Sequence, residues 1–246
     1  MCGIVGLTSE KDSSKEALHA LRKLEYRGYD SVGISTLTPN IKTSKMKGKV
    51  NDFIKKNIDI LPQGNTSIAH TRWATHGKPS KTNSHPISDN GISLVHNGII
   101  ENESLLRKNL IEKGHKFISE TDTEVILRLL IESGKSVHDA LPEVVNQLEG
   151  SFAIAILDEK NQQKIYFARK SSPLIIGVGK EEMWLSSDVN AILEKTREVC
   201  FLEDERWGFI TPDETSIFTM DGERENIKTS TIPWDPESTN KAGYPH

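Results

Sequence analysis

Cysteine is scarce in this sequence of 246 residues, which contains only Cys2 and Cys200. Two cysteines are too few for a disulfide framework, and their spacing matches no paired-cysteine zinc site. The chain also lacks a run of about 20 apolar residues that could cross a bilayer. No basic leader precedes the first apolar segment, so we expect no secretory signal. These absences predict a soluble protein of the reducing cytoplasm, where a reactive thiol survives.

A large excess of charge of one sign is absent as well. Lysine and arginine number 31 against 35 aspartate and glutamate residues, which gives a formal net charge of −4, and no basic stripe is visible. Nucleic acid and anionic membranes are therefore not expected partners. Apolar residues make up 35% of the chain, enough to bury a core at this size. Length alone does not choose between one large domain and two small ones.

The first 150 residues predict strands that alternate with helices. Apolar runs predict strands over 4–7, 32–37 and 92–96, and helical spacing predicts helices over 13–24, 105–113, 121–130 and 136–149. Ser13 with Glu16, and Thr121 with Glu124, have the spacing of capping boxes that begin helices. The lysine-rich segment 42–57 predicts a solvated face with some helix near Phe53. The segment 78–91 is rich in turn residues and predicts a long functional or disordered loop.

From Ser151 onwards the pattern changes to closely spaced strands. They are predicted over 152–157, 165–168, 174–178, 183–185, 209–210 and 217–218. Strands, then helices, then strands predict a layered α+β fold with helices segregated on antiparallel sheets. Proline and glycine recur in the polar end of the chain, so we expect one domain over 1–228 and a linker over 229–246.

Cys2 is the first candidate for chemistry. A small residue after the initiator methionine permits removal of that methionine, which leaves a thiol and a free α-amine on one residue. The amine titrates near pH ~8 in model peptides, so the residue carries its own base. Gly3 would let a substrate approach the backbone closely. The alternative is an incidental cysteine in a buried first strand.

Two further sets of residues would complete a site for amide cleavage. Asn97 and Gly98 offer a side-chain NH₂ and a backbone N–H as donors for the negative oxygen that forms when a thiolate attacks an amide. The alternative for this pair is an ordinary Asn-Gly turn of a hairpin. Arg72, assisted by Thr75 and His76, could hold a substrate carboxylate in a two-pronged contact. Asp122 could hold a substrate ammonium group, or it could simply favour the dipole of a helix start.

Four histidines raise the question of a metal site. The spacings of His70, His76, His85 and His96 match no standard zinc pattern, and no acidic residue among them could act as a base. We therefore expect neither a metal nor another cofactor. Cys200 precedes Phe201 and Leu202 and is expected to be a core residue rather than a nucleophile.

Several ordered motifs together resemble the class II glutamine amidotransferases. Within that group they are most similar to the glutaminase domain of glutamine–fructose-6-phosphate amidotransferases (glucosamine-6-phosphate synthases). The similarity extends over nearly the whole chain, and the opening Cys-Gly-Ile-Val-Gly alone would be shared with purine-pathway and asparagine-forming relatives. The motifs are 1–6 (MCGIVG), 26–31 (YRGYDS), 70–77 (HTRWATHG), 96–102 (HNGIIEN), 119–124 (SETDTE), 150–152 (GSF), 172–174 (SPL) and 186–188 (SSD).

The resemblance implies a fold, a reaction and a set of site residues. The fold would be that of the N-terminal-nucleophile hydrolases, a four-layer αββα sandwich with two antiparallel sheets. L-glutamine would be hydrolysed to glutamate and ammonia through a thioester on Cys2, with its α-amine as base and with Asn97 and Gly98 as the oxyanion hole. The residues implied in substrate binding are Arg72, Thr75 and His76 for the carboxylate, Gly98 and Asp122 for the amino group, and Arg27 and Trp73 in the lining of the site.

The resemblance also implies partners and leaves alternatives open. In the full synthases, sugar-isomerase domains use the ammonia to make glucosamine 6-phosphate from fructose 6-phosphate, and a homodimer is compatible with that enzyme. This sequence ends within what resembles the connecting linker, so we expect the polypeptide itself to release ammonia. One alternative is the glutaminase domain of another amidotransferase pathway, against which the segments 26–31 and 120–124 count. The other alternative is a non-catalytic module that senses glutamine.

Overall fold

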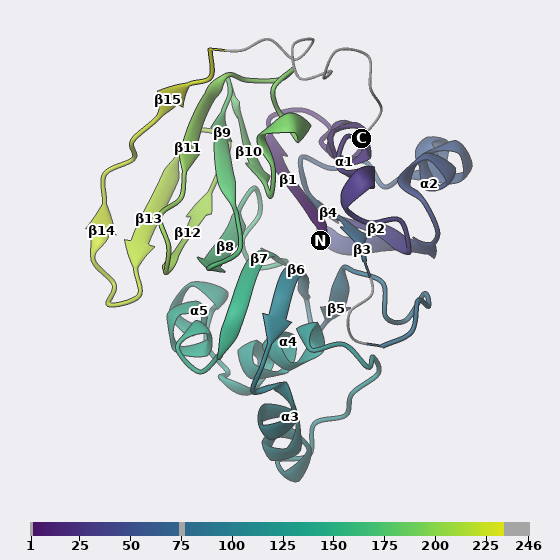
Figure 1. The fold of residues 1–246 in the computed structure, drawn as a ribbon, viewed down its shortest axis with the longest axis vertical. Coiled ribbons are helices and arrows are strands. Elements are labelled where there is room, and N and C mark those ends of the chain that lie inside the picture. The colour runs from purple at the N-terminus through teal and green to yellow at the C-terminus, as the bar shows by residue number, and fades with distance from the viewer. Residues whose placement is uncertain (1, 74–76, 234–246) are drawn as a thin grey trace.

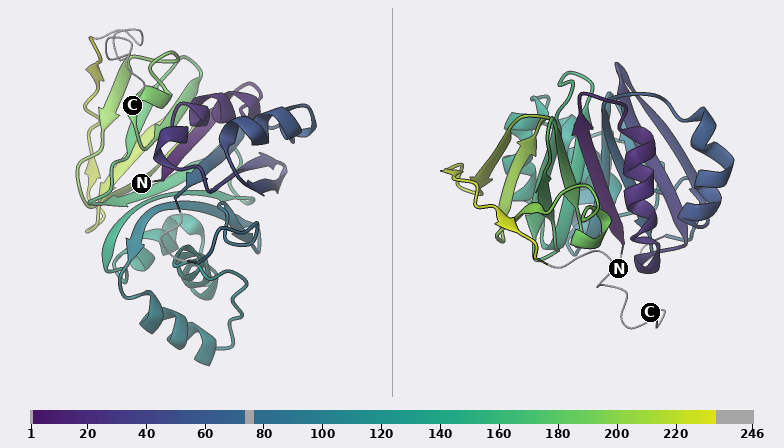
Figure 2. Two further views of the ribbon diagram at one scale, coloured as in Figure 1. Left: turned by 45° about the vertical axis from the view of Figure 1, so that its right-hand side comes forward. Right: turned by 90° about the horizontal axis from the view of Figure 1, so that it is seen from above.

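The computed structural model describes residues 2–73 and 77–233 and shows two antiparallel sheets that face each other (Figures 1 and 2). Within these residues the first sheet has eight strands. In spatial order they are β15 (Ser230–Thr231), β11 (Glu198–Phe201), β9 (Ile175–Val178), β10 (Glu182–Ser186), β1 (Gly3–Ser9), β4 (Thr66–Arg72), β2 (Ser31–Thr38) and β3 (Asn40–Lys47). The second sheet has seven described strands, in the order β14 (Arg224–Glu225), β13 (Thr215–Thr219), β12 (Arg206–Ile210), β8 (Ile165–Lys170), β7 (Gly150–Asp158), β6 (Ile92–Ile100) and β5 (Ile87–Asp89).

Helices cover the outer face of each sheet and complete four layers, as Figure 2 shows. The elements on the first sheet are α1 (Ser14–Arg22) and α2 (Val50–Asn57), with the short 3₁₀ turns η1 (Glu25–Arg27), η2 (Ile58–Ile60) and η3 (Val189–Ala191). On the second sheet lie α4 (Thr123–Glu132) and α5 (Val137–Val145), while α3 (Glu103–Glu112) packs beside α4. No helix in the described ranges is long and apolar enough to span a bilayer.

Three hydrophobic clusters lie between the four layers. Leu18, Leu21 and other residues of α1 pack on the first sheet, and Ile126 and Leu141 belong to the cluster that joins α4 and α5 to the second sheet. The third cluster fills the space between the sheets, where Phe167 is fully buried. The central strands β1 and β7 bury side chains on both faces, so each contains a nearly continuous apolar run. The predicted αββα sandwich is confirmed.

Several local predictions are wrong because the side chains concerned have other partners. The Ser13 hydroxyl donates to the Gly64 carbonyl oxygen (2.9 Å) and makes no cap contact with α1. Glu124 accepts hydrogen bonds from the backbone N–H of Ile118 (3.0 Å) and of Ser119, so Thr121 and Glu124 do not form a capping box. In contrast, the Ser136 hydroxyl does cap α5, where it accepts from the Asp139 N–H (3.2 Å).

Six of the described strands lie where the sequence predicts none: β3, β4, β5, β11, β14 and β15. In the lysine-rich segment, β3 is an edge strand with many exposed polar side chains. Its sequence therefore lacks the clear alternation of apolar and polar residues that would predict a strand. At the other end, the sequence predicts a linker from residue 229, but Ser230 and Thr231 pair with β11 and Ile232 is buried in the core of the first sheet. The remainder of that linker prediction, 234–246, lies outside the described residues.

Candidate active site

A cavity of about 390 Å³ lies where the start of β1 meets the ends of β4 and β6. Five of the residues that line it are predicted from the sequence: Cys2, Arg27, Trp73, Asn97 and Gly98. The other lining residues are Ile99, Ser151, Ser171, Ser172 and Pro173. The cavity thus brings together five of the nine residues assigned by the resemblance, from four separate segments of the chain.

Cys2 immediately precedes β1, and the packing of Gly3 holds it in place. A Cβ atom on Gly3 would lie 2.9 Å from the Cβ of Leu24 and 3.0 Å from Cγ2 of Thr71, so glycine lets the start of β1 pack tightly. The Cys2 Sγ accepts a hydrogen bond from the Trp73 N–H at 3.3 Å. Burial raises the pKa of the Cys2 thiol, while this N–H and the charge of Arg72 act in the opposite direction. The thiol therefore needs a base near neutral pH.

Asn97 and Gly98 lie within β6 and do not form a hairpin turn. The strand continues past both residues to Ile100, which pairs with Gly150 of β7, so the prediction that it ends at His96 and the turn alternative are both wrong. Asn97 Nδ2 donates to the main-chain oxygen of Cys2 at 3.1 Å. Gly98 has a φ of +117°, and a Cβ there would lie 2.0 Å from the carbonyl oxygen of Ser151. Only glycine fits this position of the strand.

Arg72 and Asp122 are both buried, and both lie near enough to Cys2 for their charges to act on its thiol. Arg72 ends β4, and its Nη2 donates to the Gly77 carbonyl oxygen at 3.4 Å. Asp122 stands at the start of α4 without capping it, because its Oδ2 accepts from the Ile100 N–H at 3.0 Å. The charges of both residues act on the pKa of the Cys2 thiol, Arg72 lowering it and Asp122 raising it, although burial is the largest influence. A cation and an anion therefore lie near the thiol, which suits a zwitterionic substrate.

The predicted substrate contacts Thr75 and His76 lie outside the described residues. On the described side of that gap, the rings of Trp73 and Tyr29 meet edge to face with centroids 5.2 Å apart. Arg27 forms an ion pair with Asp188, which also accepts a hydrogen bond from the Tyr26 hydroxyl at 2.9 Å. These contacts join the motif at 26–31 to that at 186–188, through the cavity-lining residue Arg27.

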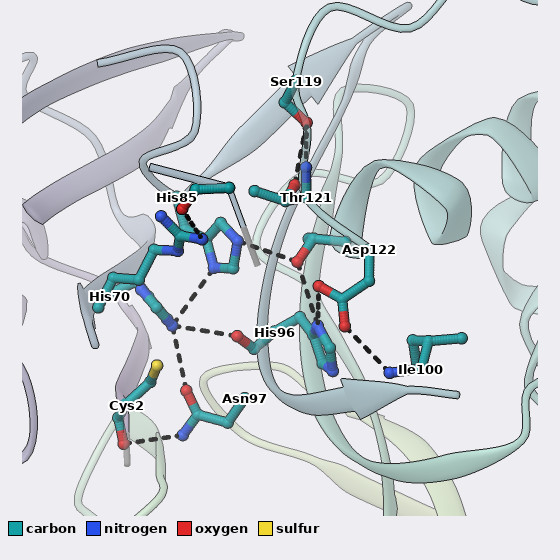
Figure 3. Close-up of polar contacts among 12 residues, drawn as sticks. Cys2, His70, His85, His96, Asn97, Ile100, Ser119, Thr121 and Asp122 are labelled. Carbon is teal, nitrogen blue, oxygen red and sulfur yellow. Dashed lines mark hydrogen bonds and ion pairs between the residues drawn. The ribbon is translucent and has the colours of Figure 1, made fainter. Parts of the chain in front are cut away.

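Behind Asn97, buried polar side chains form a hydrogen-bonded chain (Figure 3). His70, His85, Thr123 and His96 belong to it, and none of these four is assigned a role by the sequence. Within the ranges that the structure describes, no group of three His, Cys, Asp or Glu side chains is arranged to hold a metal ion. The three histidines are separated along the sequence, and only the fold brings their side chains into one hydrogen-bonded chain.

Cys200 lies in a different environment. It is buried in the cluster between the two sheets, as the sequence predicts, beside a separate cavity of about 250 Å³. Burial raises the pKa of its thiol, and the nearby carboxylates of Glu203 and Glu225 raise it further. The geometry therefore favours Cys2 over Cys200 as the site of thiolate chemistry.

Comparison with known families gives one match to a domain model. Residues 70–194 match the model described as a glutamine amidotransferase domain. This range includes Arg72, Asn97, Gly98 and Asp122, and it covers half of the chain.

Curated relatives match along the whole chain. The glutamine–fructose-6-phosphate aminotransferase (isomerizing) of Methanosarcina mazei is 44% identical over 100% of this chain and 42% of its own length. The protein of the same description from Caldanaerobacter subterraneus subsp. tengcongensis is 44% identical over 100% of this chain and 41% of its own length. The chain therefore spans about two fifths of the length of these relatives.

Solved structures show the same fold at lower identity. The glutamine phosphoribosylpyrophosphate amidotransferase of B. subtilis, solved with ADP and GMP, superposes with a TM-score of 0.79 over 89% of this chain and 49% of that chain. The two sequences are 23% identical in this comparison. The agreement supports the two-sheet architecture with its flanking helices.

Proposed function

Because the chain belongs to the class II glutamine amidotransferase domain family, we propose that it hydrolyses L-glutamine to glutamate and ammonia with Cys2 as the nucleophile. The observation that carries this proposal is the placement of the Cys2 thiol in one cavity with Asn97 and Gly98. A nucleophile and two candidate oxyanion donors thus border the same space. The chemistry of amide cleavage needs that combination.

The first step is attack by the Cys2 sulfur on the side-chain carbonyl carbon of glutamine. The thiol proton passes to the α-amine of Cys2, which is free once Met1 has been removed, and the carbonyl oxygen becomes an oxyanion. Collapse of this tetrahedral intermediate breaks the C–N bond, and the amine returns its proton to the departing nitrogen, which leaves as ammonia. Because burial raises the pKa of the thiol, an adjacent base with a pKa near ~8 suits this exchange.

Hydrolysis of the γ-glutamyl thioester completes the cycle. Water attacks the thioester carbon, its proton is taken by the same amine, and the C–S bond breaks to give glutamate and the Cys2 thiol. The oxyanion forms again in this step, so Asn97 Nδ2 and the Gly98 N–H serve both halves of the reaction. Asn97 suits the role because one N–H is already held by the Cys2 carbonyl oxygen at 3.1 Å, which fixes the plane of the amide.

Recognition of the amino-acid end of glutamine would use the charged residues near the thiol. Arg72, with Thr75 and His76, would bind the α-carboxylate, and Asp122 with Gly98 would bind the α-amino group. Arg27 and Trp73 line the cavity and would enclose the substrate. Closure over the substrate would limit loss of ammonia to water.

In the whole protein we propose that the ammonia is used for glucosamine 6-phosphate synthesis from fructose 6-phosphate. The relatives that match the full chain are glutamine–fructose-6-phosphate aminotransferases, and the matched part is about two fifths of their length. The sugar-isomerase domains of such a synthase would be the partners of this domain. The cytoplasmic location predicted from the composition belongs to the same proposal.

The test is glutamate release by the purified chain and by two cysteine variants. Cys2→Ala should abolish release, whereas Cys200→Ala should retain it, because Cys200 lies between the sheets away from the cavity that holds Asn97. A glutamine-sensing module without catalysis would bind glutamine but release no glutamate in any variant. Loss of activity in Cys200→Ala with retention in Cys2→Ala would show that the nucleophile is misassigned.

A further inference from the structure

We propose that His70 is a positioning residue that fixes the direction of the Asn97 side-chain amide, so that its N–H groups face Cys2 and the cavity. The inference rests on the proposed role of Asn97 as an oxyanion donor. His70 lies on β4 of the first sheet, is fully buried and does not line the cavity itself. Its effect on the reaction would therefore pass through Asn97.

Hydrogen-bond polarity determines which atom of His70 carries a proton. His70 Nε2 lies 3.1 Å from the main-chain oxygen of His96 and 3.1 Å from Oδ1 of Asn97 (Figure 3). A main-chain carbonyl oxygen can only accept, so Nε2 must be the donor. The atom of Asn97 that faces it must then be an acceptor, which places Oδ1 toward His70.

The other end of the Asn97 amide gives the same orientation independently. Nδ2 lies 3.1 Å from the main-chain oxygen of Cys2, which again can only accept. A rotated amide would set two donors against each other at His70 and two acceptors against each other at Cys2. Both main-chain carbonyls therefore select the single orientation in which the NH₂ group borders the thiol and leaves its second N–H for the substrate.

A second histidine extends the arrangement to the start of α4. His85 Nδ1 lies 3.3 Å from His70 Nε2, and the two rings are 4.3 Å apart at their centroids. Since His70 Nε2 donates, His85 Nδ1 accepts, and the proton of neutral His85 is on Nε2. That N–H donates to the Thr123 hydroxyl at 2.9 Å, and the same hydroxyl lies 3.1 Å from His96 Nδ1. The tautomers of His70 and His85 thus follow from one carbonyl oxygen.

The network is suited to holding an orientation rather than to moving protons. Burial lowers the pKa of His70 to about 3, helped by the charge of Arg72, and it lowers the pKa of His85 well below the ordinary value. Both rings are therefore neutral at physiological pH. Within the described residues, the hydrogen-bond partner of the Cys2 sulfur is the backbone of Trp73, not either of these rings.

The expected kinetic signature is a loss of kcat with little change in KM. The oxyanion exists only after the sulfur has attacked, so a misdirected Asn97 amide affects the transition state more than the bound substrate. Complete loss of an oxyanion donor typically costs roughly 100- to 1,000-fold in kcat. Because Asn97 stays in place and only its direction is lost, we expect His70→Leu to lower kcat by roughly 10- to 100-fold.

The kinetic test compares His70→Leu with His70→Gln and a matched control. The amide nitrogen of glutamine can donate from near the position of Nε2, so His70→Gln should recover most of kcat. His138→Leu is the control, because His138 lies on α5 against the rings of Trp207 (5.4 Å) and Phe218 (6.1 Å) and is not one of the described residues that line the cavity. Its kcat should equal that of the wild type.

A double variant and a chemical probe separate positioning from general damage. If His70 acts through Asn97, His70→Leu should add nothing to Asn97→Ala. Alkylation of Cys2 by iodoacetamide forms no oxyanion, so its rate should be unchanged in His70→Leu. Multiplicative kinetic effects, equal slowing in His70→Gln, wild-type kcat in His70→Leu, or loss of alkylation would each overturn the proposal.

A measurement on the wild type tests the assignment without turnover. Nitrogen-15 chemical shifts of the His70 ring should show Nε2 protonated and Nδ1 unprotonated at neutral pH. The opposite tautomer would overturn the inference whether or not the protein hydrolyses glutamine. Conversely, a wild type that releases no glutamate, or an Asn97→Ala variant with full activity, would remove the proposed function even if this tautomer is observed.

Discussion

Replacing Asp122 by asparagine should weaken glutamine recognition and at the same time make the Cys2 thiol more acidic. The variant should fold, because an asparagine Oδ1 can still accept the hydrogen bond from the Ile100 N–H, which is 3.0 Å long in the structure. What it loses is the negative charge beside the proposed site of the substrate ammonium. That charge also raises the pKa of the thiol, although burial is the larger influence. Its removal therefore lowers the thiol pKa.

The expected loss in kcat/KM follows from the single charged contact removed. A hydrogen bond to a charged group contributes about 1.5–3 kcal/mol, which corresponds to roughly 10- to 150-fold. Asp122 is 6% exposed, so little water competes for this contact. We therefore expect kcat/KM for glutamine to fall by roughly 10- to 150-fold. The rate of Cys2 alkylation by iodoacetamide should rise at a pH below the thiol pKa, because more thiolate is present.

The assay uses two substrates and both proteins. Glutaramate, which is glutamine without its α-amino group, cannot contact Asp122 through an ammonium. Wild-type protein should therefore prefer glutamine to glutaramate, and Asp122→Asn should lose most of that preference by slowing only with glutamine. An unchanged preference in the variant would refute the placement of the ammonium at Asp122. A slower alkylation of Cys2 would refute the electrostatic reasoning.

Three further predictions concern the clamp, the strand and the N-terminus. Arg72→Lys keeps the charge but loses the planar guanidinium that makes the two-pronged contact with the substrate carboxylate. KM for glutamine should therefore rise roughly tenfold or more in steady-state assays, and an unchanged KM would contradict this role of Arg72. Gly98→Ala should lower the free energy of unfolding by at least about 2 kcal/mol in denaturant titrations, because the new Cβ meets the Ser151 carbonyl oxygen at 2.0 Å. Gly114→Ala is its control, with a φ of +95° and nothing within 4 Å of the Cβ. A variant with an uncleavable extension before Cys2 should melt normally yet release no glutamate, and full activity would exclude the α-amine as base.

Much of the fold is predictable from the sequence, because the spacing of apolar residues within each segment shows which faces of the helices and strands are buried. Leu18 and Leu21 identify the buried face of α1, and the apolar run from Phe152 to Leu157 identifies a strand buried on both faces. The strand β3 is not predictable in this way, because as an edge strand it exposes polar side chains. Local spacing also misassigns Glu124, whose backbone partners Ile118 and Ser119 become clear only when the loop before α4 is placed.

The candidate site is predictable only where it coincides with the family motifs. Cys2, Asn97 and Asp122 stand in such motifs, and the structure places the first two in one cavity and the third close by. The lining residue Ser171 comes from the loop after β8, outside the family motifs, and no local signal connects it with Cys2. The histidine network likewise depends on contacts between distant residues, such as that between His85 and Thr123 at 2.9 Å. The direction of these hydrogen bonds can be assigned only when the positions of donors and acceptors in the fold are known.

The covalent intermediate provides the most direct test of the proposed mechanism. The purified protein would be mixed with glutamine, quenched with acid within a single turnover, digested and analysed by mass spectrometry. We predict a peptide that begins at Cys2 and carries one γ-glutamyl group on its sulfur, which hydroxylamine releases as γ-glutamyl hydroxamate. Glutamate release without any glutamyl group on Cys2, or with the group on Cys200, would contradict the account.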